Sequence, residues 1–327
     1  MYPFQSIRQS ASERITAVHH ADGQSIWVII YGPISRIENT PINTFSIYKV
    51  DESGINVPIV SQHETTISKK GAMKVSPNGK YIAIADYGRE NIDLYDFNNE
   101  TGEITLNRKI FTDTALFNPK SPYGLAFSQN SEILYYTADV IPNNYSSINQ
   151  YLINPPLPIN PLIADKKQIT TYPLNEYFGN LQLASNGKIY AATYIQNNDG
   201  SISESGQLTV IEDSNNFDNP IVSNLALDLE TGSSLKGLPN FIQSYLRNTI
   251  ITENKCVFDT FNFTTDSYAP ITNILWNFGD GNNSFRDVIL EDYTTINFSS
   301  NYRLYDTYDL YLHAKNIFDD NYEQVHG

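Results

Sequence analysis

Short stretches of alternating apolar and polar residues, separated by tight turns, recur along the first 250 residues of the chain. In the clearest stretch, Met73–Val75 is followed by Ser-Pro-Asn-Gly-Lys at residues 76–80 and by a second apolar run, Tyr81–Ala85. Proline presets φ, and Asn and Gly accept left-handed backbone, so residues 76–80 are typical of a turn. The pattern predicts a strand, a tight turn and a second strand.

This unit occurs four times. If Ala21, Ser76, Ser128 and Ser185 mark equivalent positions, successive marks lie 55, 52 and 57 residues apart. The third strand of each unit is predicted at residues 44–50, 91–97, 147–153 and 207–211. A fourth, edge strand is clearest at residues 103–107. Units of four short antiparallel strands at a period of about 40–50 residues or a little more are typical of β-propeller blades.

The number of blades is the open point of this prediction. Four units cover residues 14–213, and residues 237–246 predict the start of one further strand. Propellers usually close with four to eight blades, and the pattern is already in progress at Arg14. We therefore expect an all-β chain in which residues 1–247 form a partial or atypically closed propeller. Four to five blades are present, and we expect the N-terminal blades to be absent from this chain. A four- or five-bladed ring that is complete in itself is the alternative.

The pattern changes from Asn248 onward. Short alternating strands are predicted at residues 256–259, 261–263, 274–278 and 309–314. About 80 residues of such strands are enough for a small β-sandwich. We expect a second domain at residues 248–327.

Composition narrows the class of protein. Aromatic residues make up 13% of the 327 residues and charged residues only 17%, which favours half-buried β surface. The formal net charge of −15 and a pI of about 4.6 give no basic stripe for nucleic acid. No apolar run is long enough to span a membrane, and residues 1–6 lack the features of a signal peptide. The single cysteine, Cys256, excludes a disulfide framework and a multi-cysteine metal site.

Few residues stand out as candidates for metal chemistry. His19 and His20 are adjacent on a predicted strand and point to opposite faces, and neither they nor His63 are expected to bind metal. Asp86 ends a predicted strand and is a weak candidate for a cation ligand or base at the propeller channel. Aspartate at such a position more often accepts hydrogen bonds from turn amides.

A second weak metal candidate lies in the turn that contains Asp280 and Asn282, whose oxygens are ligands that calcium prefers. Calcium is thus the one cofactor that the sequence suggests. Trp27 and Trp276 are expected in the core rather than as sugar-stacking platforms, and Cys256 is expected to be a buried, inert thiol. No nucleophile elbow, phosphate-binding loop or zinc signature is present, so we predict no catalytic or cofactor-binding residues.

The C-terminal region resembles the PKD domain. The residues that carry this resemblance are Trp276-Asn277-Phe278-Gly279-Asp280-Gly281, Ser284 and Tyr302–Leu310. Asp306 stands where that family usually has glycine. The resemblance implies an immunoglobulin-like β-sandwich that serves as a spacer or adhesive module in extracellular proteins.

The preceding region is similar to propellers that lie directly before PKD domains in surface and gliding proteins of Bacteroidetes. The residues that carry this likeness are 13–20, 73–80, 122–128 and 237–244. Members of that group usually begin with a signal peptide and further blades and end with a type IX secretion sorting domain. Because this chain shows neither, we expect a fragment of a larger secreted protein, located outside the cell or at its surface.

These observations favour a non-enzymatic extracellular binding or adhesion module. Its propeller would present loops to a polysaccharide or protein ligand, with the PKD-like domain as a spacer. The long polar loops are predicted at residues 31–44, 140–147, 154–167 and 196–206. The first alternative is a metal-dependent, lactonase-like propeller enzyme, which shares the Ser-Pro-Asn-Gly-Lys turn, and the second is a purely structural stalk protein. The sequence leaves the ligand and the oligomeric state open.

Overall fold

The structure is a computed structural model. It describes residues 12–33, 42–63, 68, 70–111, 120–140, 145–154, 166–172, 176–197, 199, 201–253, 262–267, 274–277, 283–286, 297–304 and 308–315. The chain divides into two compact units, Met1–Thr249 and Ile250–Gly327, and each is described by itself. The domain limits expected from the sequence stay a prediction.

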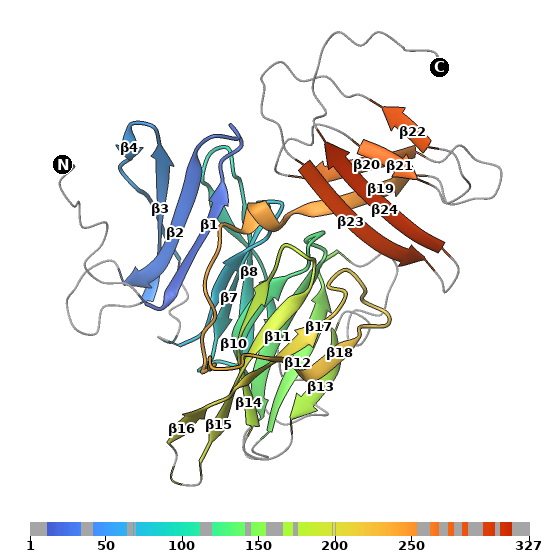
Figure 1. The fold of residues 1–327 in the computed structure, drawn as a ribbon. Helices are drawn as coiled ribbons and strands as arrows, with labels where there is room; N and C mark the ends of the chain where they lie inside the picture. Colours follow the sequence, from blue (N-terminus) through green and yellow to red (C-terminus); the bar gives the residue numbers. More distant parts are fainter. Residues whose placement is uncertain are drawn as a thin grey trace. The chain divides into compact units, whose positions relative to one another are not determined.

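The first unit is built from four antiparallel sheets that follow one another along the chain (Figure 1). Blade 1 contains β1 (Arg14–His19), β2 (Ile26–Pro33), β3 (Ile42–Asp51), β4 (Gly54–Ile55) and β5 (Ile59–Gln62). Blade 2 contains β6 (Met73–Val75), β7 (Tyr81–Asp86), β8 (Asn91–Phe97) and β9 (Ile104–Phe111). Blade 3 contains β10 (Lys120–Phe127), β11 (Ile133–Val140), β12 (Tyr145–Leu152) and β13 (Lys166–Tyr172). Blade 4 contains β14 (Glu176–Leu183), β15 (Ile189–Gln196), β16 (Ile202–Glu204), β17 (Gln207–Ile211) and β18 (Val222–Asp228).

The blades pack face to face in chain order. Phe45 and Tyr95 belong to the apolar cluster between blades 1 and 2, and Leu94 and Leu134 belong to the cluster between blades 2 and 3. A third cluster joins blades 3 and 4. Burial of these alternating side chains is the main favourable term in the stability of such a stack. The all-β prediction is confirmed, and the arrangement is that of a four-blade propeller.

The turn at residues 76–80 forms as the sequence predicts. The Ser76 hydroxyl accepts hydrogen bonds from the backbone N–H groups of Lys80 (3.2 Å) and Tyr81 (3.0 Å). Gly79 has φ +69°, and an added Cβ would lie 2.9 Å from the Asn99 side chain. This position therefore favours glycine both for its backbone and for its close packing.

The structure corrects two of the four repeat marks by one residue. The hydrogen bond that closes each turn is donated by the N–H of His20, Ser76, Ser128 and Ala184. His20 and Ala184, rather than Ala21 and Ser185, are thus equivalent to Ser76 and Ser128. The acceptor lies five residues after the donor in the first three blades and four residues after it in blade 4. This shorter turn accounts for part of the one-residue error in the repeat marks.

Residues 234–246, here called the closing segment, connect blade 4 to blade 1. Lys236 accepts a hydrogen bond from the backbone of Asn180 in β14 (2.7 Å), and Ile242 forms an isolated parallel bridge with Ala17 in β1. The sequence predicts a strand at residues 237–246, and this prediction is wrong, because the segment ends in a short 3₁₀ helix, η1 (Gln243–Leu246). In the described part of the chain it has no hairpin partner to sustain a ladder.

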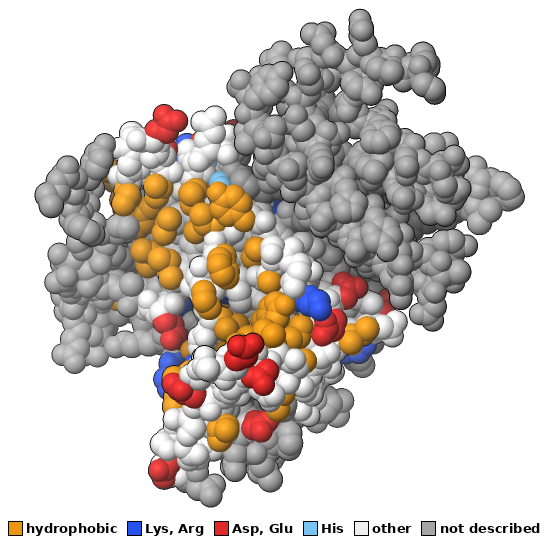
Figure 2. All heavy atoms as spheres, viewed as in Figure 1, with side chains coloured by type: hydrophobic (Ala, Val, Ile, Leu, Met, Phe, Trp, Pro, Cys, Tyr) orange, Lys and Arg blue, Asp and Glu red, His pale blue; other side chains and the backbone are white. Residues whose placement is uncertain are grey.

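Lys74 in β6 joins the inner strands of opposite blades. Its ammonium donates to the side-chain oxygens of Gln182 in β14 and Asn240 in the closing segment, each at 2.7 Å. Figure 2 shows apolar side chains gathered over β1, β2 and the closing segment. Ile15 of β1 and Phe241 of the closing segment are exposed, with 45% and 53% of their surface accessible.

The second unit is described through its strands. One sheet has the order β22 (Asn283–Arg286), β21 (Ile274–Asn277), β24 (Tyr308–Lys315) and β23 (Asn297–Leu304), and β19 (Asn248–Glu253) pairs with β20 (Asn262–Ser267). The predicted strand at residues 256–259 lies outside the described residues. In the part of the chain that the structure describes, no helix has the length and apolar character needed to cross a membrane.

Candidate functional site

The turn-closing hydrogen bonds align the four blades and identify one special position. The acceptors of these bonds are the carbonyls of Ser25, Tyr81, Ile133 and Lys188. Six residues after these acceptors, the four blades carry Tyr31, Tyr87, Asp139 and Tyr194. Three blades place tyrosine at this position, and blade 3 places a carboxylate there.

These residues lie at the end of the blades opposite the Ser76-type turns. Asp139 pairs with Ser121 at the start of β10, and Tyr194 pairs with Tyr177 at the start of β14. Tyr123 follows on β10. Tyr87, Tyr123, Tyr177 and Tyr194 are here called the tyrosine cluster, which blades 2, 3 and 4 build together around Asp139.

The tyrosine cluster contacts Asp139 directly. The Tyr87 hydroxyl donates a hydrogen bond to Oδ2 of Asp139 at 3.1 Å. The Tyr87 and Tyr123 rings meet edge to face with centroids 6.3 Å apart, and those of Tyr177 and Tyr194 stack at 5.5 Å. Such aromatic pairs add favourable energy beyond the area that they bury.

Two lysines flank this cluster. Lys236, in the closing segment, places its Nζ 4.8 Å from the centroid of the Tyr194 ring. Lys70, which precedes β6, places its Nζ 5.7 Å from the centroid of the Tyr87 ring. Both are cation–π contacts. The site therefore combines a carboxylate, phenol hydroxyls and two positive charges.

Burial controls the titration of the site. Only 8% of the surface of Asp139 is exposed, and this burial raises the pKa of its carboxyl. Hydrogen bonds from Tyr87 and Ser146 and the charge of Lys236 act in the opposite direction on that pKa. Burial also raises the pKa of Tyr123 to about 12 and that of Tyr87 further, so both phenols stay protonated donors at neutral pH. A carboxyl with a raised pKa is a stronger base than an ordinary carboxylate, which suits it to proton transfer.

Asp86, which the sequence singled out, lies outside this site. Its Oδ1 accepts hydrogen bonds from the backbone N–H of Ser68 (3.0 Å) and Gly88 (3.2 Å), and its Oδ2 lies 3.8 Å from Nε of Arg89. The carboxylate thus fixes a loop through backbone amides. Asp93 lies nearby, in β8, 3.8 Å from Nζ of Lys109.

The histidines do not converge. Nδ1 of His19 lies 2.7 Å from the Ser244 hydroxyl, and burial lowers the pKa of His19 to about 4. His20 pairs with Asp22 at 3.1 Å, and Nε2 of His63 lies 3.1 Å from the Ser61 hydroxyl. Within the described residues, no three or more His, Cys, Asp or Glu side chains are grouped to hold a metal ion. The metal-dependent alternative therefore finds no ligand set of this kind there.

The candidate calcium ligands Asp280 and Asn282 lie outside the described residues and stay predictions. The same holds for Cys256. Trp27 is buried, and its indole N–H donates to the carbonyl of Asn99 at 2.7 Å.

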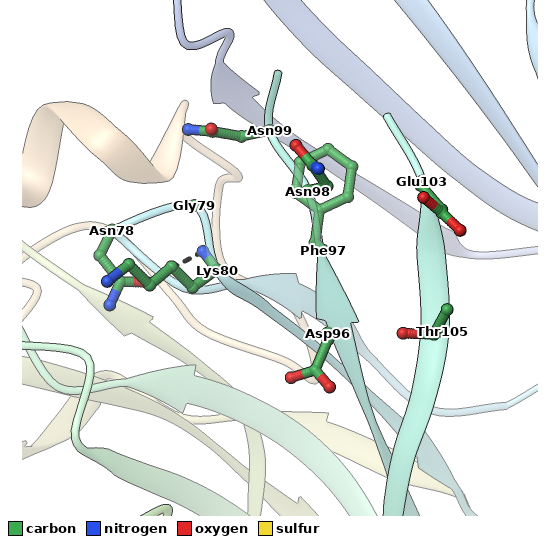
Figure 3. A pocket seen from close by; sticks show the side chains of 9 residues that line it. All are labelled: Asn78, Gly79, Lys80, Asp96, Phe97, Asn98, Asn99, Glu103 and Thr105. Atoms are coloured by element: carbon green, nitrogen blue, oxygen red, sulfur yellow. Dashed lines mark hydrogen bonds between the residues drawn. The ribbon is translucent and has the colours of Figure 1, made fainter. Parts of the chain in front are cut away.

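A depression of about 710 Å³ lies at the opposite, turn end of blade 2 (Figure 3). Its lining is polar, with Lys80, Asp96 and Glu103 among the charged side chains. Asn78 in this lining accepts a hydrogen bond from the Lys80 backbone (3.0 Å), and Asp96 accepts two from Asn107 (2.8 and 2.9 Å). These groups hold the turn and the strand pair, so the depression is a weaker candidate than the Asp139 site.

No protein-family model matches the chain, and a search among curated proteins gives no match either. Among solved structures, the chain is similar to a 6-phosphogluconolactonase candidate from Bacteroides uniformis, with 14% identity over 72% of this chain and 74% of that chain, and a TM-score of 0.38. It is also similar to the periplasmic gluconolactonase of Pseudomonas aeruginosa, with 13% identity, 69% and 74% coverage, and a TM-score of 0.36. A third is a protein of unknown function from Desulfotomaculum acetoxidans, with 12% identity, 60% and 55% coverage, and a TM-score of 0.35. The chain spans about half the length of that third protein.

The expectation of a non-enzymatic adhesion module is contradicted by these matches and is withdrawn, because two of the three are named as lactonases. The expected Bacteroidetes origin, PKD domain and type IX secretion find no support in them. At these identities and TM-scores the likenesses assign no activity to this chain.

Proposed function

We propose that the chain is an enzyme that hydrolyses a lactone of a sugar acid at Asp139. The observation that carries this proposal is the place of Asp139 in the repeat: blade 3 has a buried carboxylate where the other three blades have tyrosine. A buried carboxylate costs free energy, and a perturbed ionisable group among convergent polar side chains is typical of an active site.

The proposed reaction needs one general base. Ionised Asp139 accepts a proton from a water molecule, whose oxygen attacks the lactone carbonyl. The bond between the carbonyl carbon and the ring oxygen then breaks, and the ring oxygen leaves with the proton that Asp139 returns. The products are a hydroxyl group and a carboxylic acid, which ionises. General acid–base catalysis of this kind supplies about 10²–10⁴-fold in rate.

The neighbouring groups suit the charge that develops in this reaction. Lys236 and the phenol of Tyr123 are donors for the carbonyl oxygen as it becomes an oxyanion. The stacked rings of Tyr177 and Tyr194 are buried and form the apolar side of the site. The positive charges of Lys70 and Lys236 also attract the anionic product, although the net charge of the chain is −15.

Base consumption at constant pH with glucono-δ-lactone tests the proposal, because each hydrolysis releases one acid. The wild-type chain is expected to exceed the spontaneous rate, and Asp139→Asn is expected to lose about 10²–10⁴-fold in kcat/KM. Asp96→Asn, an exposed aspartate at the turn end, is the matched control and keeps the wild-type rate. A panel of sugar lactones that the wild type hydrolyses no faster than buffer would overturn the proposal.

For the second unit we propose that residues 248–327 form a PKD-like spacer and that the protein acts outside the cell. The support is the antiparallel pairing of β21 with β22, in which Trp276 pairs with Ser284 and Asn277 pairs with Asn283. Limited proteolysis of the full chain is expected to cut near residue 250 and to release a resistant C-terminal fragment. Uniform digestion of residues 250–327 would contradict this proposal.

A further inference from the structure

Arg14 is buried completely at the start of β1, away from the reacting groups described above. Its guanidinium donates to three backbone carbonyls: Nη1 to Ser68 (2.7 Å), and Nη2 to Lys70 (2.6 Å) and Ala85 (2.9 Å). Burial lowers the pKa of Arg14, and the carboxylates of Asp86 and Glu13 act in the opposite direction. A buried cation is costly, and the planar guanidinium of Arg14 offsets this cost by donating to three acceptors in a fixed geometry.

The three carbonyls belong to the two segments that flank Tyr87. Ser68 and Lys70 lie in the loop before β6, and Ala85 lies in β7, two residues before Tyr87. The Lys70 carbonyl also accepts from the Tyr87 backbone N–H at 3.4 Å. The corner formed by residues 68, 70, 71 and 85–88 is therefore tied together from blade 1.

Two acidic residues tie the same corner from other sides. Asp86 accepts from the backbone of Ser68 and Gly88, and Glu13 accepts from the backbone of Gly71 at 2.5 Å. A Cβ at Gly71, whose φ is +120°, would collide with the Ala85 carbonyl, so loop and strand are in close contact. Little freedom is left for the backbone that carries Tyr87.

We propose that Arg14 is a positioning residue for the Asp139 site: it holds the corner that aims the Tyr87 hydroxyl at the Asp139 carboxylate, without contacting either side chain. This inference rests on the proposed function of that site. It assigns to blade 1 a part in a site otherwise built by blades 2, 3, 4 and the closing segment. The geometric chain runs from Arg14 through the Lys70 and Ala85 carbonyls to Tyr87 and from there to Asp139.

The test measures the Tyr87–Asp139 hydrogen bond in two ways, by an NMR titration that needs no substrate and by the rate of lactone hydrolysis. A fluorine label on Tyr87, introduced as 3-fluorotyrosine, reports the protonation of Asp139 through its NMR shift, and Asp139→Asn identifies that titration. The titratable groups that face Asp139 are Tyr87, Tyr123, Tyr177, Tyr194 and Lys236. Of these, Tyr87 lies within the corner that Arg14 holds.

Arg14→Lys keeps the positive charge and removes the planar guanidinium that donates to the three carbonyls. We expect the midpoint of the fluorine titration to move to higher pH, because the Tyr87 hydrogen bond, which favours the ionised carboxylate, is weakened. We expect kcat to fall about tenfold or more with KM within about twofold. Arg108→Met, at a half-buried arginine of β9, is the control and matches wild type in both measurements. If Arg14→Lys does not fold, Ser68→Gly loosens the same corner and is expected to shift the midpoint in the same direction.

A wild-type midpoint and rate in folded Arg14→Lys would overturn the inference, and so would an unshifted midpoint in Ser68→Gly if that variant has to replace it. The fluorine titration needs no substrate. If the wild type hydrolyses no lactone, the proposed function fails while the shift of the midpoint still decides the role of Arg14.

Discussion

Tyr87 of blade 2 and Asp139 of blade 3 occupy the same position in their repeats, and the hydroxyl of one donates to the carboxylate of the other at 3.1 Å. The repeat thus brings equivalent positions of blades 2 and 3 into contact at the end opposite the Ser76-type turns. A tyrosine at residue 139 would place a second phenol beside Tyr87. The change to aspartate instead creates a hydrogen-bonded acid within the tyrosine cluster.

Removal of the Tyr87 hydroxyl is the most direct test of this relationship. The hydrogen bond lowers the pKa of Asp139, so Tyr87→Phe is expected to raise it and to move the acidic limb of the kcat/KM profile to higher pH. Activity at neutral pH is expected to fall about tenfold. Lactone hydrolysis measured from pH 4 to pH 9 checks this. Tyr190→Phe, whose hydroxyl contacts Asn186 at the turn end, is the control, and a profile for Tyr87→Phe identical with the control would contradict the prediction.

The blades could be predicted from the sequence because their determinants are local. The Ser76 hydroxyl and the left-handed Gly79 build a turn within six residues, and the flanking runs alternate with the period of a strand. The repeat spacing of 52 residues between Ser76 and Ser128 also relates Tyr87 to Asp139. The signal for the site was therefore present in the repeat alignment, at a position where one blade differs from the others.

The parts that sequence reasoning missed depend on contacts between distant segments. Arg14 binds carbonyls that lie 54, 56 and 71 residues away, and a backbone carbonyl carries no sequence signal. The closing segment has the pattern of a strand, but an isolated bridge to Ala17 and the contact of His19 with Ser244 set its conformation instead. Local propensity is a weak prior where such tertiary contacts decide.

The close approach of β14 to the closing segment makes a second prediction. A Cβ at Gly179 would lie 2.5 Å from the Lys236 carbonyl, which is shorter than any tolerated contact. Gly179→Ala is therefore expected to destabilise the fold by about 1–3 kcal/mol and to displace Lys236 from Tyr194. Urea unfolding measures the first effect. Gly206→Ala, at a glycine with open space around its Cβ position, is expected to be close to neutral, and equal stability of the two variants would contradict this account.

His19 predicts a dependence of stability on pH. Burial lowers the pKa of His19 from 6.5 to about 4, so the native state favours the neutral ring. The corresponding stability is present above about pH 6.5 and is lost as the pH falls from there through about 4. Hydrogen exchange of residues 242–246 is expected to speed up over this range, because His19 contacts Ser244 and Tyr245. In His19→Gln this added dependence is expected to disappear, whereas an unchanged dependence would assign it to other groups.

For Asp139 we expect a pH dependence of stability with the opposite sign to that of His19. Burial raises its pKa above the unfolded value, so its native state favours the protonated acid. Its contribution to stability is therefore largest below the unfolded pKa and is lost as the pH rises through the folded pKa. Asp139→Asn mimics the protonated form at every pH, and its amide oxygen can still accept from Tyr87. The variant is expected to melt at a higher temperature than wild type at pH 7 and at nearly the same temperature at pH 3. Greater stability together with lost activity is the trade-off expected of a residue that serves catalysis rather than folding. If Asp139→Asn is less stable than wild type at pH 7, Asp139 is instead a structural residue.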